Sequence, residues 1–291
     1  MLRTKLAIMF FVVSLLALPL AAQQQQSNPP PPPPPPPSTA QEAQQTAPPP
    51  MAPEDLDRLV NRIALYPDPL LAQVLTGSTY WDEIPDAANW ADEHSGLKGD
   101  ALAQAIKDDN LQWDPSVLAL LPFPSVLDMM ARDPDWTQQL GEAVLNQRPD
   151  VMDGVQRMRK EAYDYGYLRT SPYDTVTMDD GYCEILPVNP AYLYVPVYDP
   201  GVVFFAPRPG FFIGGAIGFG PAVIITGAFA PWGWAHPYFL WRSHGIFFDN
   251  GPWGRTWMNR GFYRHSYARP WVRSAGPRIE RHSFSRPRGR P

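Results

Sequence analysis

The sequence contains one cysteine, Cys183, among its 291 residues. A single cysteine excludes a disulfide framework within the chain and every metal site that needs several cysteines. The sequence also lacks the motifs of common enzymes: G-x-S-x-G, H-E-x-x-H, a phosphate-binding glycine loop and a Cys–His nucleophile signature. We therefore expect no cofactor and no metal, and we interpret Cys183, which falls in an expected strand, as a buried thiol.

Acidic and basic residues are unevenly distributed. Residues 51–200 contain 26 Asp and Glu against 10 Lys and Arg, a net charge of −16. Residues 201–291 contain 2 against 12, a net charge of +10, and all twelve cations are arginine. With 37 prolines and 21 glycines in addition, the composition argues against one uniform globule.

The N-terminus has the pattern of a cleaved export signal. Arg3 and Lys5 precede an uncharged apolar run, which ends in small residues at Ala22. The run is about 15 residues long, which is short for a bilayer span. We predict a signal peptide at 1–22 and a protein of the periplasm, the cell envelope or the medium. Residues 23–53, with thirteen prolines and seven glutamines, are predicted to be a disordered linker.

Residues 54–171 are predicted to form an acidic domain of short helices. Apolar residues recur at i, i+3, i+4 and i+7, and Asp-Pro recurs at Asp68, Asp114 and Asp133. An aspartate can cap the free N–H groups of a first helical turn, and a following proline has no N–H to leave unpaired. The expected helices are 54–65, 69–78, 84–94, 98–108, 115–121, 124–131, 134–147 and 149–165.

Residues 172–200 are predicted to form a small antiparallel β segment. Two short β-type runs flank Asp179-Asp180-Gly181, and Asp-Gly favours a tight hairpin turn. Residues 191–197 could add a third strand, and Pro196 places it at an edge or a bend.

Five motifs occur in order between residues 54 and 205: I-A-L-Y-P-D-P-L-L-A-Q-V-L, W-D-P-S-V-L, D-W-T-Q-Q-L-G, D-V-M-D-G-V-Q-R-M-R and Y-V-P-V-Y-D-P. Together they resemble a family of exported bacterial proteins catalogued as a domain of unknown function. The resemblance implies a Gram-negative envelope or secreted protein in which a helical domain leads into a short β segment. It supplies no catalytic residues.

A glycine-rich apolar segment, 201–240, contains 25 uncharged residues at 211–235. Three interpretations are open: a membrane-spanning helix, a contact with a membrane surface or a second copy through the small residues Gly214, Gly218 and Ala222, and plain packing beside the hairpin.

Arginines alternate with aromatic residues in a C-terminal tail, 241–291, which we predict to be disordered. The candidate contacts are Arg242, Arg255, Arg260, Arg264, Arg269, Trp241, Trp253, Trp257 and Trp271. Arginine suits stacking and bidentate phosphate contacts. Export makes nucleic acid an unexpected partner and favours a membrane surface, lipopolysaccharide or a cell-wall polymer. The intramolecular alternative is that the basic tail folds onto the acidic domain.

These observations favour a non-enzymatic structural or interaction protein of the cell envelope, contacting membrane, wall or polyanion through its C-terminal region. One alternative is an envelope hydrolase that uses carboxylates of residues 54–200, since paired carboxylates can hydrolyse glycans. The other is a membrane protein anchored by a single span at 211–235. The expected fold class is mainly α, followed by a small antiparallel β segment.

Overall fold

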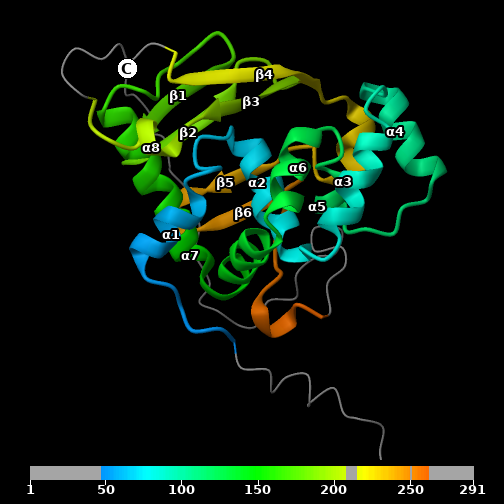
Figure 1. Cartoon of the computed structure of the whole chain (residues 1–291), viewed down its shortest axis with the longest axis horizontal. Helices are drawn as coiled ribbons and strands as arrows, with labels where there is room; N and C mark the ends of the chain where they lie inside the picture. The colour runs from blue at the N-terminus through cyan, green and yellow to red at the C-terminus, as the bar shows by residue number, and fades with distance from the viewer. Residues whose placement is uncertain (1–46, 208–214, 250, 262–291) are drawn as a thin grey trace, which may run out of the picture. The chain divides into compact units, whose positions relative to one another are not determined.

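The computed structural model describes residues 47–207, 215–249 and 251–261. The predicted signal peptide and most of the predicted linker therefore lie outside the described residues. The predicted fold class is confirmed, because short helices are followed by small antiparallel sheets (Figure 1). The α-helices of the described residues are α1 (Pro53–Val60), α2 (Asp68–Gly77), α3 (Ile84–Glu93), α4 (Gly99–Asp108), α5 (Pro115–Leu118), α6 (Pro124–Arg132), α7 (Pro134–Asp164) and α8 (Pro200–Val203).

All three Asp-Pro pairs lie at the start of a helix, and two of the three aspartates cap it as predicted. Asp114 Oδ1 accepts a hydrogen bond from Ser116 N at 2.9 Å, and Asp133 Oδ1 accepts one from Trp136 N at 3.2 Å. Asp68 differs, because Pro67 occupies the N-cap of α2 and the Asp68 side chain makes no capping bond. The two helices predicted at 134–147 and 149–165 are the halves of α7, which is kinked at Gln147.

The long helix α7 packs on α1 and on the 3₁₀ helix η2 (Ser78–Tyr80). Backbone meets backbone at Gly141, where an added Cβ would lie 2.1 Å from the carbonyl oxygen of Ser78. A glycine at this position is therefore required by the space between the two helices.

Replacement of Gly141 by alanine is expected to lower the free energy of unfolding by about 2–3 kcal/mol, because overpacking forces the backbone to shift. Gly154→Ala, in the same helix, is the matched control. Its added Cβ would lie 3.2 Å from Asp57 Oδ1, the end of a side chain that can move. Urea unfolding followed by tryptophan fluorescence measures both variants, and equal stabilities would contradict the tight contact at Gly141.

The predicted hairpin is present as β1 (Asp174–Asp179) and β2 (Tyr182–Pro187). Asp180 and Gly181 have φ values of 48° and 87°, as a two-residue type I′ turn requires. The expected third strand is β3 (Tyr192–Tyr198), but it pairs with β4 (Ile217–Ile224) in a separate sheet. The register of that pair shifts between Tyr194 and Pro196, so Pro196 lies at the predicted bend.

A membrane-spanning helix at 211–235 is wrong for the described part of that range. Residues 217–224 form β4, and the 3₁₀ helix η3 (Gly227–Trp232) follows. Gly218 and Ala222 pair with β3, while Gly214 lies outside the described residues. Glycines weaken a helix, whereas β3 offers backbone partners. In the ranges that the structure describes, none of the helices has the length and apolar character to cross a bilayer.

Ordered structure continues beyond Leu240, where the tail was predicted to begin. The third sheet contains β5 (Tyr238–Leu240), β6 (Gly245–Phe248) and β7 (Gly251–Pro252), followed by the 3₁₀ helix η5 (Trp257–Asn259). β5 lies against α2 (Figure 1). Three hydrogen bonds connect residues 233–253 to the helices: Gln73 donates to Gly233 O, Trp234 to Ala119 O and Arg148 to Trp253 O. The intramolecular alternative therefore holds for the described part of the basic half.

Candidate functional site

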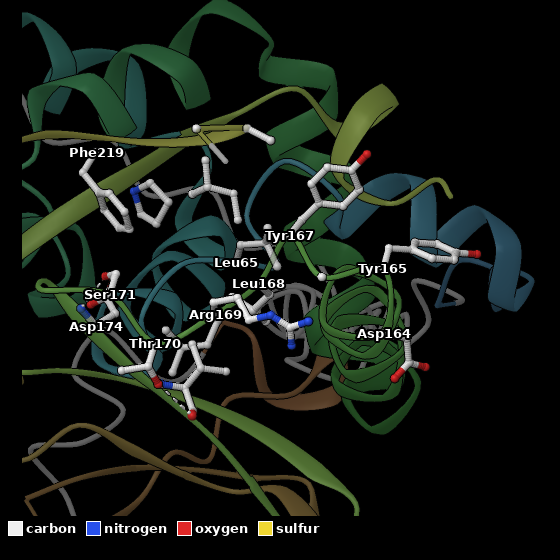
Figure 2. A pocket seen from close by; sticks show the side chains of 17 residues that line it. Leu65, Asp164, Tyr165, Tyr167, Leu168, Arg169, Thr170, Ser171, Asp174 and Phe219 are labelled. Carbon is white, nitrogen blue, oxygen red and sulfur yellow. Dashed lines mark hydrogen bonds between the residues drawn. The ribbon is translucent and has the colours of Figure 1, made fainter. Parts of the chain in front are cut away.

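A cavity of about 550 Å³ lies between the C-terminal end of α7, the β1–β2 hairpin and the β3–β4 sheet. The lining residues that matter most for its chemistry are Leu65, Tyr167, Asp174, Val176, Ile185 and Phe219. Figure 2 shows Asp174 beside Ser171, and Tyr167 toward the end of α7. The wall combines apolar and aromatic side chains with a smaller group of polar and charged ones, as small-molecule sites do.

Asp174 is the unusual residue of this wall. It is the first residue of β1, its side chain is 4% exposed, and its Oδ1 has no hydrogen-bond partner among the described residues. Burial raises the pKa of Asp174 to about 7. Its backbone is fixed by Ser171, whose Oγ accepts from Asp174 N at 3.1 Å and whose N–H donates to Asp174 O at 2.8 Å. The strand start therefore holds the carboxyl group in place.

The hydroxyl groups beside Asp174 are used by the backbone. Thr170 Oγ1 accepts from Val176 N at 3.0 Å and donates to Val176 O at 3.1 Å. Ser171 Oγ accepts from the N–H groups of Tyr173 and Asp174, both at 3.1 Å. The Asp174 carboxyl group and the hydroxyl hydrogen of Ser171 are therefore the polar groups at this end of the cavity with unused hydrogen-bonding capacity.

Directly behind the hairpin lies a buried ion pair. Arg159 Nη1 donates to Asp68 Oδ1 at 2.6 Å, and both side chains are almost fully buried. The remaining Arg159 hydrogen bonds go to the carbonyl oxygens of Ala64, Tyr66 and Cys183, at 2.8 to 2.9 Å.

The ion pair also involves the C-terminal half. The ring of Trp241 lies 5.0 Å from the Arg159 guanidinium carbon, and its Nε1 donates to Asp68 Oδ2 at 3.2 Å. One guanidinium group thus connects α2, α7, β2 and the segment after β5. Its hydrogen bonds are satisfied within the protein, so we assign it a structural role.

Two carboxylates of the helical domain, Glu83 and Asp114, lie close together outside the cavity wall. Glu83 Oε2 accepts from Asp114 N at 2.6 Å, and burial raises the pKa of Glu83 to about 7 and that of Asp114 to about 6. Arg255 lies over the ring of Tyr80, at 3.5 Å from its centroid, and its charge lowers the pKa of both carboxyl groups. The wall of the 550 Å³ cavity includes neither carboxylate. Their neighbours make this a packed structural cluster, separate from the carboxylates of the cavity wall.

Three of the nine predicted surface contacts are buried. Trp241 is 4% exposed, Trp253 is 2% exposed and Arg255 is 9% exposed. The alternation of arginine with aromatic residues reflects packing at these positions, where Arg148 lies over Trp253 at 5.2 Å and Arg255 lies over Tyr80. These three side chains are therefore unavailable to an external polyanion, contrary to the prediction.

The other predicted contacts have different positions. Arg242 is exposed and pairs with Asp180 of the hairpin turn. Arg260 lies 3.9 Å above the ring of Trp257, and both are half-buried. Arg264, Arg269 and Trp271 lie outside the described residues.

Cys183 is a buried thiol in β2, as predicted, and burial raises its pKa to about 11, which does not suit a nucleophile. Among the residues that the structure describes, no three His, Cys, Asp or Glu side chains gather as a metal site would require.

The sequence of this chain is similar to a known protein family. Residues 52–208, more than half of the chain, match the family described as "Protein of unknown function (DUF3300)". The chain is 36% identical over 181 residues to the uncharacterized protein YacH of Escherichia coli (strain K12), an alignment that covers 51% of this chain and 29% of YacH. No solved structure matches. Asp68, Arg159 and Asp174 lie within the matched residues, and the chain belongs to the DUF3300 family.

Proposed function

We propose that this chain is an exported, non-enzymatic protein of the cell envelope that contacts an anionic surface through its arginine-rich C-terminus. The export pattern at residues 1–22 supports the compartment. The observation that supports this contact is where the arginines of the C-terminal half lie. Arg255 is buried, Arg242 and Arg260 reach the surface of the folded unit, and residues 262–291 add eight arginines and one glutamate, a net charge of +7.

The chemistry of this segment favours phosphate groups. Arginine binds phosphate through two parallel hydrogen bonds, and tryptophan and tyrosine settle at a lipid interface. Each basic residue near an anionic bilayer contributes about 1 kcal/mol, so a net charge of +7 is enough for salt-sensitive attachment. Lipid headgroups and lipopolysaccharide both present such phosphates in a bacterial envelope.

The test compares the full chain with a chain that ends at Gly261. A longer deletion from residue 201 would remove β4 to β7 and expose the ion pair beneath Trp241, so it would test folding and not binding. We expect the full chain to sediment with vesicles containing phosphatidylglycerol at low salt, and to be released at high salt. The shortened chain should remain in solution, as should the full chain with phosphatidylcholine vesicles.

A variant with all eight arginines of residues 262–291 changed to lysine separates phosphate geometry from charge. Retained but weaker sedimentation would support bidentate contacts, because lysine keeps the charge and loses the planar donor pair. Equal sedimentation of the full and shortened chains would overturn the proposal. Sedimentation with purified wall polymer and not with vesicles would reject lipid phosphate as the target. Export itself predicts an N-terminal peptide that begins near Gln23 in the mature protein.

A further inference from the structure

The cavity beside Asp174 points to a function that a basic C-terminus does not explain. A buried carboxylate normally has a cation or several hydrogen-bond donors as partners, because an unpaired buried charge is costly. Asp174 is 4% exposed and has an oxygen without a partner among the described residues. Among the described residues no hydrogen bond to Asp174 Oδ1 offsets this cost. A buried polar group of this kind is typical of binding sites.

The neighbouring side chains limit what could pair with Asp174. The hydroxyl oxygens of Thr170 and Ser171 already accept backbone N–H groups. Arg169, the cation on the cavity wall, is exposed, and its guanidinium lies over the ring of Tyr163 at 5.3 Å from the centroid. Asp164, on the same wall, is a second carboxylate. The described residues therefore supply no cation to the Asp174 carboxyl group, and the ammonium of a bound ligand would fill that role.

The apolar part of the cavity wall indicates the chemistry of the rest of the ligand. Val176, Ile185 and Phe219 present apolar surface near Asp174. The ring of Tyr173 lies 4.7 Å from the ring of Phe219, which supports the position of Phe219. An apolar body would gain from burial here, and a cationic donor would satisfy the carboxylate. The net charge of −16 on residues 51–200 attracts cations and disfavours anions.

We propose that this cavity binds a small organic amine, whose ammonium group donates to Asp174 and whose apolar body lies against Phe219, Val176 and Ile185. The cavity volume of about 550 Å³ is within the range of small-molecule sites. This binding is independent of the proposed contact with anionic surfaces, and either can fail without the other.

Three matched probes test the charge preference: tyramine, the neutral alcohol tyrosol and the anion 3-(4-hydroxyphenyl)propionate. They share one aromatic ring and differ in the terminal group. Titration of the full chain at pH 8, followed by calorimetry, should give about tenfold or tighter binding of tyramine than of tyrosol, and weaker binding still of the anion.

Two variants test whether Asp174 causes the preference for tyramine over tyrosol. Asp174→Asn keeps the shape of the side chain and should reduce the preference for tyramine over tyrosol to about twofold or less. Asp179→Asn, at the exposed end of the same strand, should leave the preference unchanged. A bound ammonium also favours the ionised carboxyl group. Binding at pH 7 should therefore release protons, seen as a heat that depends on the buffer, and Asp174→Asn should abolish this release.

The proposal is overturned if tyramine at about 1 mM does not bind, since an ammonium placed on a buried carboxylate should reach at least that affinity. It is also overturned if the anion binds as well as tyramine, or if Asp174→Asn binds tyramine as tightly as the original chain does. Tighter binding of tyrosol than of tyramine would mean that Asp174 is a hydrogen-bonding group for alcohols.

Discussion

Replacement of Arg159 by methionine is expected to lower the free energy of unfolding by about 3–5 kcal/mol, because it leaves the buried Asp68 carboxylate without its cation. The variant also loses the donors to three carbonyl oxygens and the contact with Trp241. Burial raises the pKa of Asp68 and Arg159 lowers it. In the variant we therefore expect the pKa of Asp68 to rise further, because burial is no longer opposed by Arg159. Guanidinium unfolding followed by tryptophan fluorescence measures the change.

Arg157→Met is the matched control, two residues earlier in α7. Arg157 pairs with Asp57 at 2.6 Å, but its side chain is 40% exposed, so the expected loss is about 1 kcal/mol or less. Adding Asp68→Asn to Arg159→Met should recover part of the lost stability, since it removes the unpaired carboxylate. If Arg159→Met were no more harmful than Arg157→Met, the buried ion pair would not organise the core. Should Arg159→Met give no folded protein, Asp68→Asn alone supplies the measurement.

Replacement of Asp174 by asparagine is expected to raise the free energy of unfolding by about 2–3 kcal/mol at pH 8 and by less than about 1 kcal/mol at pH 4. Burial raises the pKa of Asp174 from 3.8 to about 7 in the folded state, so ionisation favours the unfolded chain. The stability that this carboxyl group provides when protonated is complete below about pH 4 and is lost as the pH rises through about 7. Asparagine cannot ionise, so the penalty disappears.

Chemical unfolding between pH 4 and pH 8 measures this difference for Asp174→Asn, with Asp179→Asn as the control on the same strand. For the control we expect little change in stability, because Asp179 is exposed. If the difference in free energy of unfolding between Asp174→Asn and the original chain did not change with pH, the Asp174 carboxyl group would be hydrated or paired. A gain in stability on losing a polar side chain is the usual signature of a residue retained for binding.

Local rules predicted the helices and the hairpin well. Asp114 and Asp133 cap α5 and α7, and Asp180-Gly181 forms the turn between β1 and β2, because each depends on residues that are close in sequence. Asp68 has the same Asp-Pro pattern but a different partner. Arg159 is 91 positions away, and helix-start rules contain no information about it.

The cavity and the C-terminal half could not be predicted for the same reason. Leu65, Tyr167, Asp174 and Phe219 come together from four separate segments, and nothing in the local sequence of Asp174 indicates a buried carboxyl group. Small residues every four positions suggested a helix at 211–235, yet the pairing of β4 with β3 outweighs that spacing. Arginine next to aromatic residues suggested a surface, whereas Trp241, Trp253 and Arg255 pack inside.

The contact of Trp241 with Asp68 has a consequence for how the protein is made. The indole is synthesised 82 positions after Arg159 (241 − 159), a delay of roughly 4–16 s at about 5–20 residues per second. Until then the nascent chain lacks the ring that lies over Arg159 and the indole N–H that donates to Asp68. We therefore expect the helical segment to be less stable alone than in the whole chain, because the contacts of Trp241 with Asp68 and Arg159 form last. The last contacts of this ion pair therefore form only when about four fifths of the chain has been made.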